Sequence, residues 1–242
     1  MSKKNFKKVL VVLGGTSGER EISIETGKAC IKALKKKKYI VDQFDPKYQN
    51  INLINRQKVD VIFNALHGKD GEDGVAQSYF EYLRIPYTHS GVISSYNAMN
   101  KVISKKLFIK NKILTPRYCT IKKKEIKKLS LNQMMKINNL SFPLVIKPID
   151  EGSSLGVKIV NKSQDLKKKI KLLLNKYDQL ILEQYIGGKE IQSAVLNKMP
   201  LGAIELVPKR TFYDYKAKYL KSAKTEHIMP ANLKKKDYSK VL

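Results

Sequence analysis

The N-terminal part of the chain alternates apolar runs with amphipathic segments, and this alternation restricts the possible folds more than any other feature. Lys8–Leu13 is apolar after its first residue and leads into Gly14-Gly15, which is typical of a buried parallel strand. The next segment has the spacing of one helix face, at Ile24, Gly27, Ile31 and Leu34. Repeated strand, helix, strand order predicts an α/β domain with a parallel sheet and crossover helices.

The same patterns predict elements along the rest of the chain. Strands are predicted at Tyr39–Phe44, Val59–Asn64, Ile85–Thr88, Pro143–Pro148, Val157–Val160, Gln179–Gln184, Ile191–Leu196 and Leu201–Val207. Helices are predicted at Val75–Leu83, Ser94–Lys110 and Ser163–Tyr177, the second as a long link between domains. Pro208–Leu242 has few signals of either kind. Because compact domains rarely end on so long an irregular segment, we expect the protein to continue beyond it.

The composition is that of a soluble globular protein. The chain has 242 residues, of which 42% are hydrophobic and 29% charged, enough to bury a sizeable core. Its apolar runs are far shorter than the about 20 residues that a membrane-spanning helix needs. The run Val9–Leu13 is also shorter than the about 7–15 apolar residues of a signal peptide. We therefore expect no association with a membrane.

The net charge of +27 raises the question of a nucleic-acid partner. Only five of the 48 basic residues are arginine, the side chain that most often contacts bases, and aromatic residues do not alternate with the lysines. We interpret the lysines as a solvated surface that binds no nucleic acid, although its positive field would attract an anionic nucleotide. Cysteines and histidines are few and scattered, without metal-binding or disulfide spacing, which predicts a cytoplasmic protein without a zinc site.

Two loops fall at the expected carboxyl ends of parallel strands, the edge of such sheets where ligands bind. Gly14–Glu19 is a glycine-rich turn in which Glu19 would repel a phosphate but would suit a ligand ammonium group; a plain strand-to-helix turn is the alternative. His67 would offer a proton near a carboxylate or phosphate, or would make only local hydrogen bonds. Glu72 and Asp73 are placed to cap the helix that follows.

The strongest motif is a lysine on an apolar strand followed by a small-residue loop. Lys147 lies within the predicted strand Pro143–Pro148, and the loop Glu151–Gly156 comes directly after. A lysine on a buried strand is costly unless it meets an anion, and the loop supplies hydroxyl and N–H donors for a mobile lid over phosphates. A merely exposed lysine on an edge strand is the alternative.

Two later segments complete this pattern. Glu183–Ile186 ends a strand, where backbone groups would meet an adenine edge and the Glu183 carboxylate would hold ribose hydroxyls; an ordinary hairpin is the alternative. Thr211–Tyr219 is aromatic and basic, and it would fold over substrate and triphosphate or form an interaction patch.

The chain resembles the D-alanine–D-alanine ligases of the ATP-grasp superfamily in five segments: GGTSGEREIS, ALHGKDGEDG, VIKPIDEGSSLG, LEQYIGGKE and TFYDYKAKY. The resemblance implies an α/β (α+β overall) ATP-grasp fold in three parts. These are an N-terminal parallel-sheet substrate-binding domain at residues 1–93, a central ATP-grasp subdomain at 94–178, and an incomplete C-terminal subdomain at 179–242. It also implies ATP-dependent ligation of two D-alanines through an acyl phosphate, for peptidoglycan precursors, and a homodimer.

The resemblance implies a role for each matching residue. Glu19 would hold the ammonium group of the first D-alanine, and His67 would lie near its carboxylate. Ser153 and Tyr219 would join Glu19 in a hydrogen-bonded catalytic set, and Tyr219 favours D-alanine as the second substrate. ATP phosphates would be bound by Lys101, Lys147, Ser154 and Lys218. The adenine and ribose pocket would be lined by Glu183, Tyr185, Ile186 and Glu190, with Phe212 covering it.

Two departures from the family pattern matter. Asn100 stands where the family has an aspartate before Lys101, which loses a supporting carboxylate. The chain ends at Leu242, before the family's residues that bind Mg²⁺ or Mn²⁺, so we expect no metal ligand here and an inactive chain. Another ATP-grasp carboxylate–amine ligase and a non-catalytic nucleotide-binding remnant are the alternatives. Glu19, Ser153 and Tyr219 together argue against the first.

Overall fold

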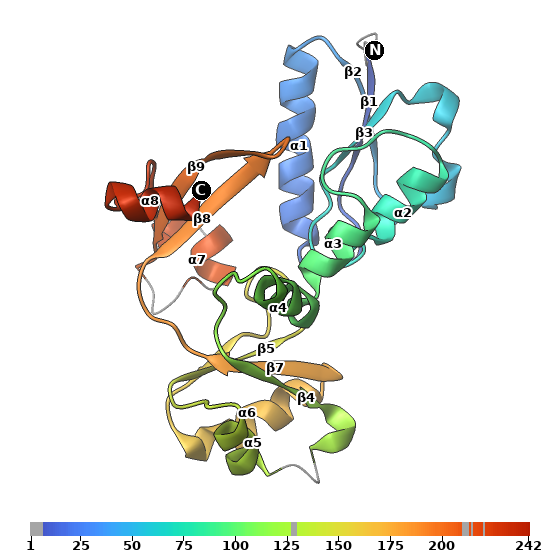
Figure 1. Cartoon of the computed structure of the whole chain (residues 1–242). Helices are drawn as coiled ribbons and strands as arrows, with labels where there is room; N and C mark the ends of the chain where they lie inside the picture. The colour runs from blue at the N-terminus through green and yellow to red at the C-terminus, as the bar shows by residue number, and fades with distance from the viewer. Residues whose placement is uncertain (1–6, 127–129, 210–212, 214, 220) are drawn as a thin grey trace. The chain divides into compact units, whose positions relative to one another are not determined.

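The structure is a computed structural model that describes residues 7–126, 130–209, 213, 215–219 and 221–242. The chain forms two compact units, residues 1–115 with 149–152 and residues 116–148 with 153–242. Each unit contains its own hydrophobic core and its own sheet or sheets (Figure 1). Within the described residues, no helix has both the length and the apolar character needed to cross a membrane.

The sheet of the first unit is parallel, as the alternating sequence predicts. Its strands are β1 (Lys8–Val12), β2 (Ile40–Phe44) and β3 (Val61–Asn64), in the order β2-β1-β3. Val9 of β1 pairs with Val41 on one side and with Val61 on the other. Because β1 is central and both of its faces are covered, its sequence is apolar without alternation.

Helices cover the two faces of this sheet (Figure 1). On one face, α1 (Arg20–Lys36) packs through Ile24, Ile31 and Leu34. Gly27 lets α1 approach the strand, since a Cβ on it would lie 2.6 Å from the Cβ of Leu13. On the other face, α2 (Val75–Tyr82) buries Ala76 and Phe80. Two short 3₁₀ turns, η1 (Ile51–Leu53) and η2 (Arg56–Lys58), connect β2 to β3.

The predicted helix Ser94–Lys110 is wrong as a single element. The structure has two helices, α3 (Val92–Met99) and α4 (Lys101–Lys110). Asn100 between them is extended, and its side-chain oxygen accepts the backbone N–H groups of Val102 and Ile103, each at 3.1 Å. Asparagine is a strong N-cap, so it starts a new helix here instead of continuing the first one. The predicted strand Ile85–Thr88 is reduced to a single bridge from Tyr87 to Ile62.

The second unit contains a four-stranded antiparallel sheet in the order β4-β7-β5-β6. Its strands are β4 (Tyr118–Lys122), β5 (Leu144–Pro148), β6 (Lys158–Val160) and β7 (Gln179–Gln184). Helices α5 (Leu131–Ile137) and α6 (Ser163–Leu174) contribute to its core, and a 3₁₀ turn, η3 (Lys123–Glu125), follows β4. The sequence patterns predict β5, β6, β7 and α6 but neither β4 nor α5.

A second antiparallel sheet of this unit has the order β10-β9-β8. The predicted pair β8 (Glu190–Leu196) and β9 (Met199–Val207) is a hairpin whose turn residues, Asn197 and Lys198, have φ of 49° and 66°. Positive φ at both positions is the geometry of a type I′ turn. The expectation of an irregular Pro208–Leu242 is wrong. That segment contains α7 (Tyr215–Tyr219), η4 (Lys221–Ala223), β10 (Glu226–Ile228) and α8 (Lys235–Val241).

Candidate functional site

The glycine-rich turn after β1 is fixed by side chains from neighbouring segments. The N–H of Gly14 donates to Ser23 Oγ at 2.8 Å, and that hydroxyl donates to the carbonyl of Ala65 at 2.7 Å. The N–H of Gly15 donates to Asp45 Oδ1 at 3.0 Å. Arg20 then pairs with Asp45 at 2.7 Å and donates to the Gly15 carbonyl at 2.7 Å. The turn is therefore attached to the ends of both neighbouring strands.

The charge on Asp45 is stabilised by this arrangement. Burial by itself raises the pKa of Asp45. The hydrogen bonds from Arg20 and from the backbone N–H groups of Lys47 and Gly15 lower it, and together they outweigh the effect of burial. The net result is a pKa below the ordinary value of the carboxyl group. The same hydrogen bond raises the pKa of Arg20. The pair therefore stays ionised at neutral pH.

Glu19 lies at the end of the turn and is 3% exposed. A Cβ on Gly68 would lie 2.7 Å from Glu19 Oε2, and a Cβ on Gly152 would lie 2.8 Å from the same oxygen. A Cβ at either position would therefore require the Glu19 carboxylate to move. The hydroxyl of Ser17 donates to the His67 carbonyl at 2.7 Å and connects the turn to the loop after β3. The Glu19 carboxylate is thus closely surrounded by three segments of the first unit.

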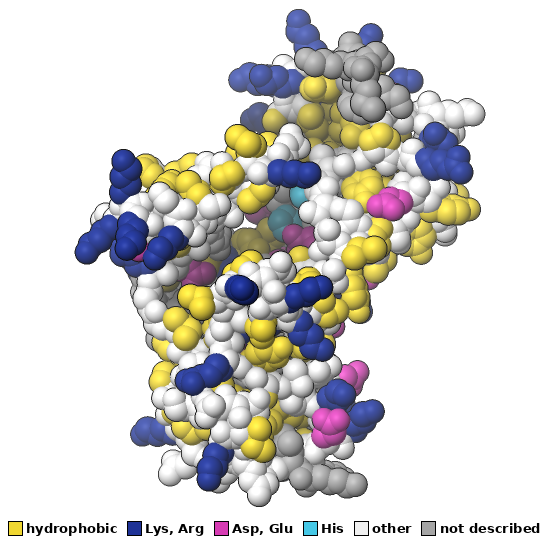
Figure 2. Space-filling model, viewed as in Figure 1, with side chains coloured by type: hydrophobic (Ala, Val, Ile, Leu, Met, Phe, Trp, Pro, Cys, Tyr) yellow, Lys and Arg dark blue, Asp and Glu magenta, His cyan; other side chains and the backbone are white. Residues whose placement is uncertain are grey.

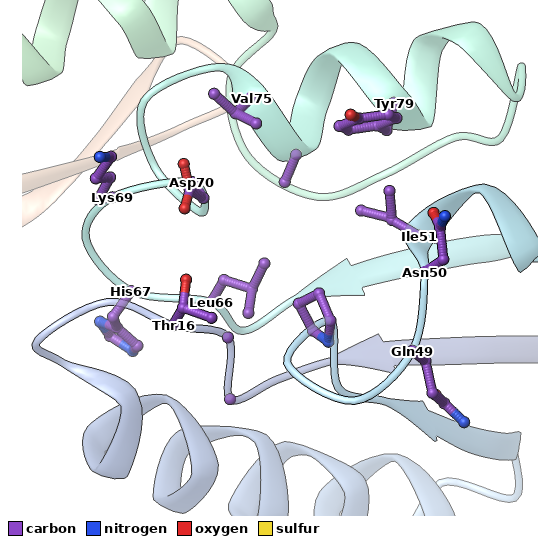
Figure 3. Close-up of a pocket in the computed structure, with 14 residues that line it drawn as sticks. Thr16, Gln49, Asn50, Ile51, Leu66, His67, Lys69, Asp70, Val75 and Tyr79 are labelled. Atoms are coloured by element: carbon purple, nitrogen blue, oxygen red, sulfur yellow. The ribbon is translucent and has the colours of Figure 1, made fainter.

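The loop His67–Gly74 is the second candidate loop and forms part of a pocket of about 250 Å³. Figure 3 shows the pocket between this loop, the glycine turn and the segment Gln49–Ile51. His67 Nε2 is 3.1 Å from Thr26 Oγ1 of α1. The pocket lies at the carboxyl ends of the parallel strands, the edge at which the sequence predicts ligand binding.

The two acidic residues of this loop have different contacts. Asp73 Oδ1 accepts the N–H of Val75, the first residue of α2, at 3.2 Å, although the N-cap position itself is Gly74. Glu72 does not cap the helix in the described contacts. Its Oε2 accepts the N–H of Gly68 at 2.7 Å and so closes the loop on itself.

Lys101, at the start of α4, contacts the segment 149–152 of the same unit. Its Nζ donates to the carbonyl of Glu151. Its backbone N–H donates to the carbonyl of Ile149 at 2.8 Å, which fixes the segment beside the first turn of α4. Gly152, whose position next to Glu19 is described above, belongs to the same segment. The start of α4 and the surroundings of Glu19 are therefore connected through four residues.

In the second unit, Lys147 forms an ion pair with Glu183. The two residues are diagonal neighbours on adjacent strands, since Val145 is paired with Glu183 and Lys147 with Ile181. Their side chains are 23% and 8% exposed. Strand β5 lies between β7 and β6, so Lys147 is not on an edge strand. The structure thus brings together two residues that the resemblance assigns to different parts of a nucleotide.

The small-residue loop after β5 is bonded to the aromatic, basic segment. Ser153 Oγ lies 2.5 Å from the Tyr219 hydroxyl, and Ser154 Oγ donates to the Tyr213 carbonyl at 2.9 Å. Ser153 and Ser154 have φ of 47° and 61°, a left-handed conformation that is uncommon for serine. The Tyr219 ring also packs edge-on against Tyr215, with centroids 4.9 Å apart. The two loops therefore form one hydrogen-bonded structure.

The remaining candidates of the adenine and ribose pocket are less confined. Tyr185 is half-buried and its N–H donates to the Pro143 carbonyl at 3.2 Å, whereas Ile186 is 64% exposed. Glu190 is exposed at the start of β8. Burial and, after it, the negative charge of Glu190 raise the pKa of Tyr213. Phe212 lies outside the described residues.

Lys218 contacts an aromatic ring of its own segment. Lys218 Nζ lies 5.3 Å from the centroid of the Tyr213 ring, a cation–π contact within the aromatic segment. Figure 2 shows the Lys and Arg side chains dispersed over the visible face among uncharged surface. In the part of the chain that the structure describes, no group of three or more His, Cys, Asp or Glu residues could hold a metal ion.

Several residues of these loops are not found by sequence motifs. Asp45 follows β2 at the ligand-binding edge of the sheet, and that position is the one signal that could have indicated it. The buried polar side chains of Ser23, Asn64 and Gln77 have no such signal, because a single polar residue in a helix or strand is usually exposed.

Comparisons with known proteins agree with the resemblance. Family models described as D-ala D-ala ligase N-terminus and D-ala D-ala ligase C-terminus match residues 42–90 and 107–242. A D-alanine–D-alanine ligase of Pelagibacter ubique is 50% identical over 97% of this chain and 76% of its own length. One of Trichlorobacter lovleyi is 39% identical over 97% of this chain and 73% of its own length. The crystal structure of a Bacillus anthracis D-alanine–D-alanine ligase complexed with ATP matches 94% of this chain and 72% of its own, with 30% identity and a TM-score of 0.76.

Proposed function

The chain belongs to the D-alanine–D-alanine ligase family, and from this premise we propose that it joins two D-alanines to D-alanyl-D-alanine with ATP, for peptidoglycan precursor synthesis. Its fold is the mixed α/β fold of that family's solved structures. The use of ATP is supported by the similar structure that was solved with ATP. The reaction class is attack of an amine on a carboxylate that ATP has activated.

The observation that carries the proposal is the hydrogen bond between Ser153 and Tyr219. It joins the small-residue loop after the lysine strand to the aromatic, basic segment, the two parts that would fold over substrate and triphosphate. An exposed interaction patch, the alternative for the aromatic segment, would not require this bond. Water exclusion by such loops strengthens the electrostatic interactions inside a site.

In this proposal, Glu19 holds the ammonium group of the first D-alanine. Its carboxylate is 3% exposed, and a buried carboxylate is stabilised when it meets a cation. His67 lies near the first D-alanine's carboxylate, and Tyr219 with Ser153 orders the loops around the substrates. Orientation of the two reacting amino acids is the contribution that these residues make to the rate.

The phosphates of ATP are bound by Lys101, Lys147, Ser154 and Lys218 in the same proposal. Glu183 orients Lys147 through their ion pair, so the ammonium is already positioned before a nucleotide enters. The positive charges stabilise the phosphoryl group in transfer. Adenine and ribose are bound by Glu183, Tyr185, Ile186 and Glu190, with Phe212 covering them.

The chemistry has two steps in this family reaction. An oxygen of the first D-alanine's carboxylate takes the γ-phosphoryl group of ATP, which gives an acyl phosphate and ADP. The amine of the second D-alanine, after loss of a proton, forms the peptide bond and displaces phosphate. Mg²⁺ or Mn²⁺ would neutralise phosphate charge. Within the described residues, no cluster of acidic or histidine side chains is suited to hold such an ion.

Three further features belong to the proposal. We propose the three-part division at residues 1–93, 94–178 and 179–242, a homodimer, and a cytoplasmic location, where ATP is available. The dimer is supported by the family resemblance and by exposed apolar side chains of the first unit such as Ile93, which is 75% exposed. Sedimentation at several protein concentrations measures the association.

The test of the proposed function measures ADP and D-alanyl-D-alanine formation with ATP, Mg²⁺ and D-alanine. Glu19→Gln is compared with Glu21→Gln, an exposed glutamate at the start of the same helix. In contrast to the expectation of an inactive chain, the proposed function predicts ATP turnover that depends on D-alanine, lost in Glu19→Gln and kept in Glu21→Gln. Calorimetry of ATP and D-alanine binding examines the same sites without turnover. Equal responses to D-alanine and L-alanine, or no binding of either ligand, would contradict the proposal.

A further inference from the structure

The carbonyl of Gly71 accepts two side-chain hydrogen bonds. Asn64 Nδ2 and Gln77 Nε2 each donate to it at 2.9 Å, and the two residues are 2% and 1% exposed. Asn64 ends β3 and Gln77 lies in α2, so the bonds come from the elements on either side of the loop His67–Gly74. Asn64 Oδ1 also accepts the N–H of Leu66 at 3.2 Å. The middle of the loop is therefore attached to both of its ends.

This attachment continues to Glu19 through short contacts. Next to Gly71, Glu72 accepts the N–H of Gly68 at 2.7 Å. Gly68 lies against Glu19, since a Cβ on it would be 2.7 Å from Glu19 Oε2. A displacement of the loop by a few tenths of an ångström would therefore change the space around the Glu19 carboxylate. The position of Gly71 therefore affects the surroundings of the Glu19 carboxylate, the group that would bind the ammonium of the substrate.

Cavities adjoin this loop, although its backbone packs closely at Gly71, where a Cβ would lie 2.4 Å from Leu66 Cβ. Leu66, His67, Lys69 and Asp70 line the pocket of about 250 Å³ (Figure 3). Leu66, Gly71 and Glu72 line another of about 310 Å³. Lys69 and Asp70 are exposed. A segment beside such space can shift unless hydrogen bonds hold it.

The burial of the Gln77 side-chain amide is in part energetically unfavourable. Its Oε1 is buried and has no hydrogen-bond partner within the described part of the chain. A buried polar atom without a partner is destabilising, and methionine would fill nearly the same volume without that cost. The contribution of the glutamine is therefore its Nε2–H bond to Gly71, which no apolar residue can make.

We propose that Asn64 and Gln77 are positioning residues that hold the loop His67–Gly74 beside Glu19 and so shape the site of the first amino-acid substrate. The inference rests on the proposed function for the identity of that substrate. It assigns neither residue a contact with substrate. The positioning itself is a property of the free protein and is measurable without turnover.

The first experiment is hydrogen exchange of the full chain, with Gln77→Met compared with Ser78→Ala. Ser78 is the exposed neighbour of Gln77 on α2, and its hydroxyl donates to the Val75 carbonyl at 2.7 Å. We expect faster exchange at residues 67–74 in Gln77→Met alone, with strands β1 to β3 unchanged. The melting temperature stays equal or rises, because the unpaired oxygen is removed. Unchanged loop exchange in Gln77→Met would overturn the positioning role.

The second experiment measures D-alanine and ATP dependence in the same variants. We expect the KM for the first D-alanine to rise by about two- to tenfold in Gln77→Met, the equivalent of one hydrogen bond, with the KM for ATP unchanged. A lower kcat together with a lower melting temperature, with the KM for D-alanine unchanged, would indicate a merely structural role and contradict the inference. If the unaltered chain neither binds nor uses D-alanine, the proposed function fails, and the exchange result still decides whether the loop is positioned by Gln77.

Discussion

The hydroxyl groups of Ser153 and Tyr219 lie 2.5 Å apart, although 66 residues separate them in the chain. Tyr219 reaches this position from α7, and its ring is also packed against Tyr215. The bond thus joins the short helix α7 to the loop after β5. Removal of this hydrogen bond would alter the proposed lid and leave the rest of the unit unchanged.

Tyr219→Phe removes the hydroxyl and keeps the ring. We expect kcat/KM for dipeptide formation to fall by about two- to tenfold, the equivalent of one neutral hydrogen bond. Tyr215→Phe is the control, because it preserves the ring pair without touching the bond to Ser153. Steady-state kinetics measure the effect. Equal rates in Tyr219→Phe and the unaltered chain would remove this bond from the mechanism.

Lys147→Met removes the ammonium that is paired with Glu183. We expect ATP to bind about 10- to 100-fold more weakly, the equivalent of one charge-assisted hydrogen bond, with D-alanine binding unaffected. Lys158→Met, on the neighbouring strand β6 and exposed, serves as the control. Titration calorimetry gives both dissociation constants, and circular dichroism verifies that the variants are folded. An unchanged ATP affinity would contradict the phosphate role.

Gly27→Ala tests how closely α1 approaches β1. The added Cβ would lie 2.6 Å from Leu13 Cβ. Overpacking costs about 1–3 kcal/mol and acts against the about 1 kcal/mol that alanine gains over glycine within a helix. We therefore expect a net loss of up to about 2 kcal/mol in the free energy of unfolding, measured in urea. Lys28→Ala, on the exposed side of the same helix, should change it by less than about 0.5 kcal/mol.

The stability of the first unit should depend on pH through Asp45. Because the folded-state pKa of Asp45 is lowered, its ionisation stabilises the fold above the unfolded pKa of about 3.9. That stability is lost as the pH falls from there through the lowered folded pKa. Urea unfolding at a series of pH values measures the loss. Asp45→Asn should make the curve flatter below about pH 4, whereas Asp42→Asn, exposed on the strand β2 that precedes Asp45, should not.

Much of the fold could be predicted because its patterns are regular. Strand β1 follows from an uninterrupted apolar run, α1 from a helical spacing, and the β8–β9 hairpin from two adjacent strands. The sequence pattern does not show the break at Asn100, because the apolar spacing continues across it. The break depends on a single side chain, that of Asn100, which caps the second helix. The elements after Pro208 were missed because each is too short to show a periodic pattern.

The candidate site was predictable where its chemistry lies in short motifs. Glu19, Lys147 and Ser153 stand out because glycine, serine or apolar neighbours make them unusual. Asp45, Asn64 and Gln77 are different, because they act through side-chain hydrogen bonds to backbone groups of other segments. Such bonds are created by the tertiary arrangement, so no local sequence pattern contains them. The roles of all these residues stay predictions until the variants are measured.

The four residues Ile149–Gly152 belong to the first unit, although the chain on both sides of them belongs to the second. The boundary between the units is therefore crossed at residues 115–116, 148–149 and 152–153. A fragment that stops at Thr115 would lack the Ile149 carbonyl that accepts the Lys101 N–H, and the Gly152 backbone next to Glu19. Dissection of this chain into separately expressed halves would consequently remove part of one unit along with the other. A single proteolytic cut between residues 115 and 116 would leave only the four residues Ile149–Gly152 of the first unit on the same fragment as the second unit.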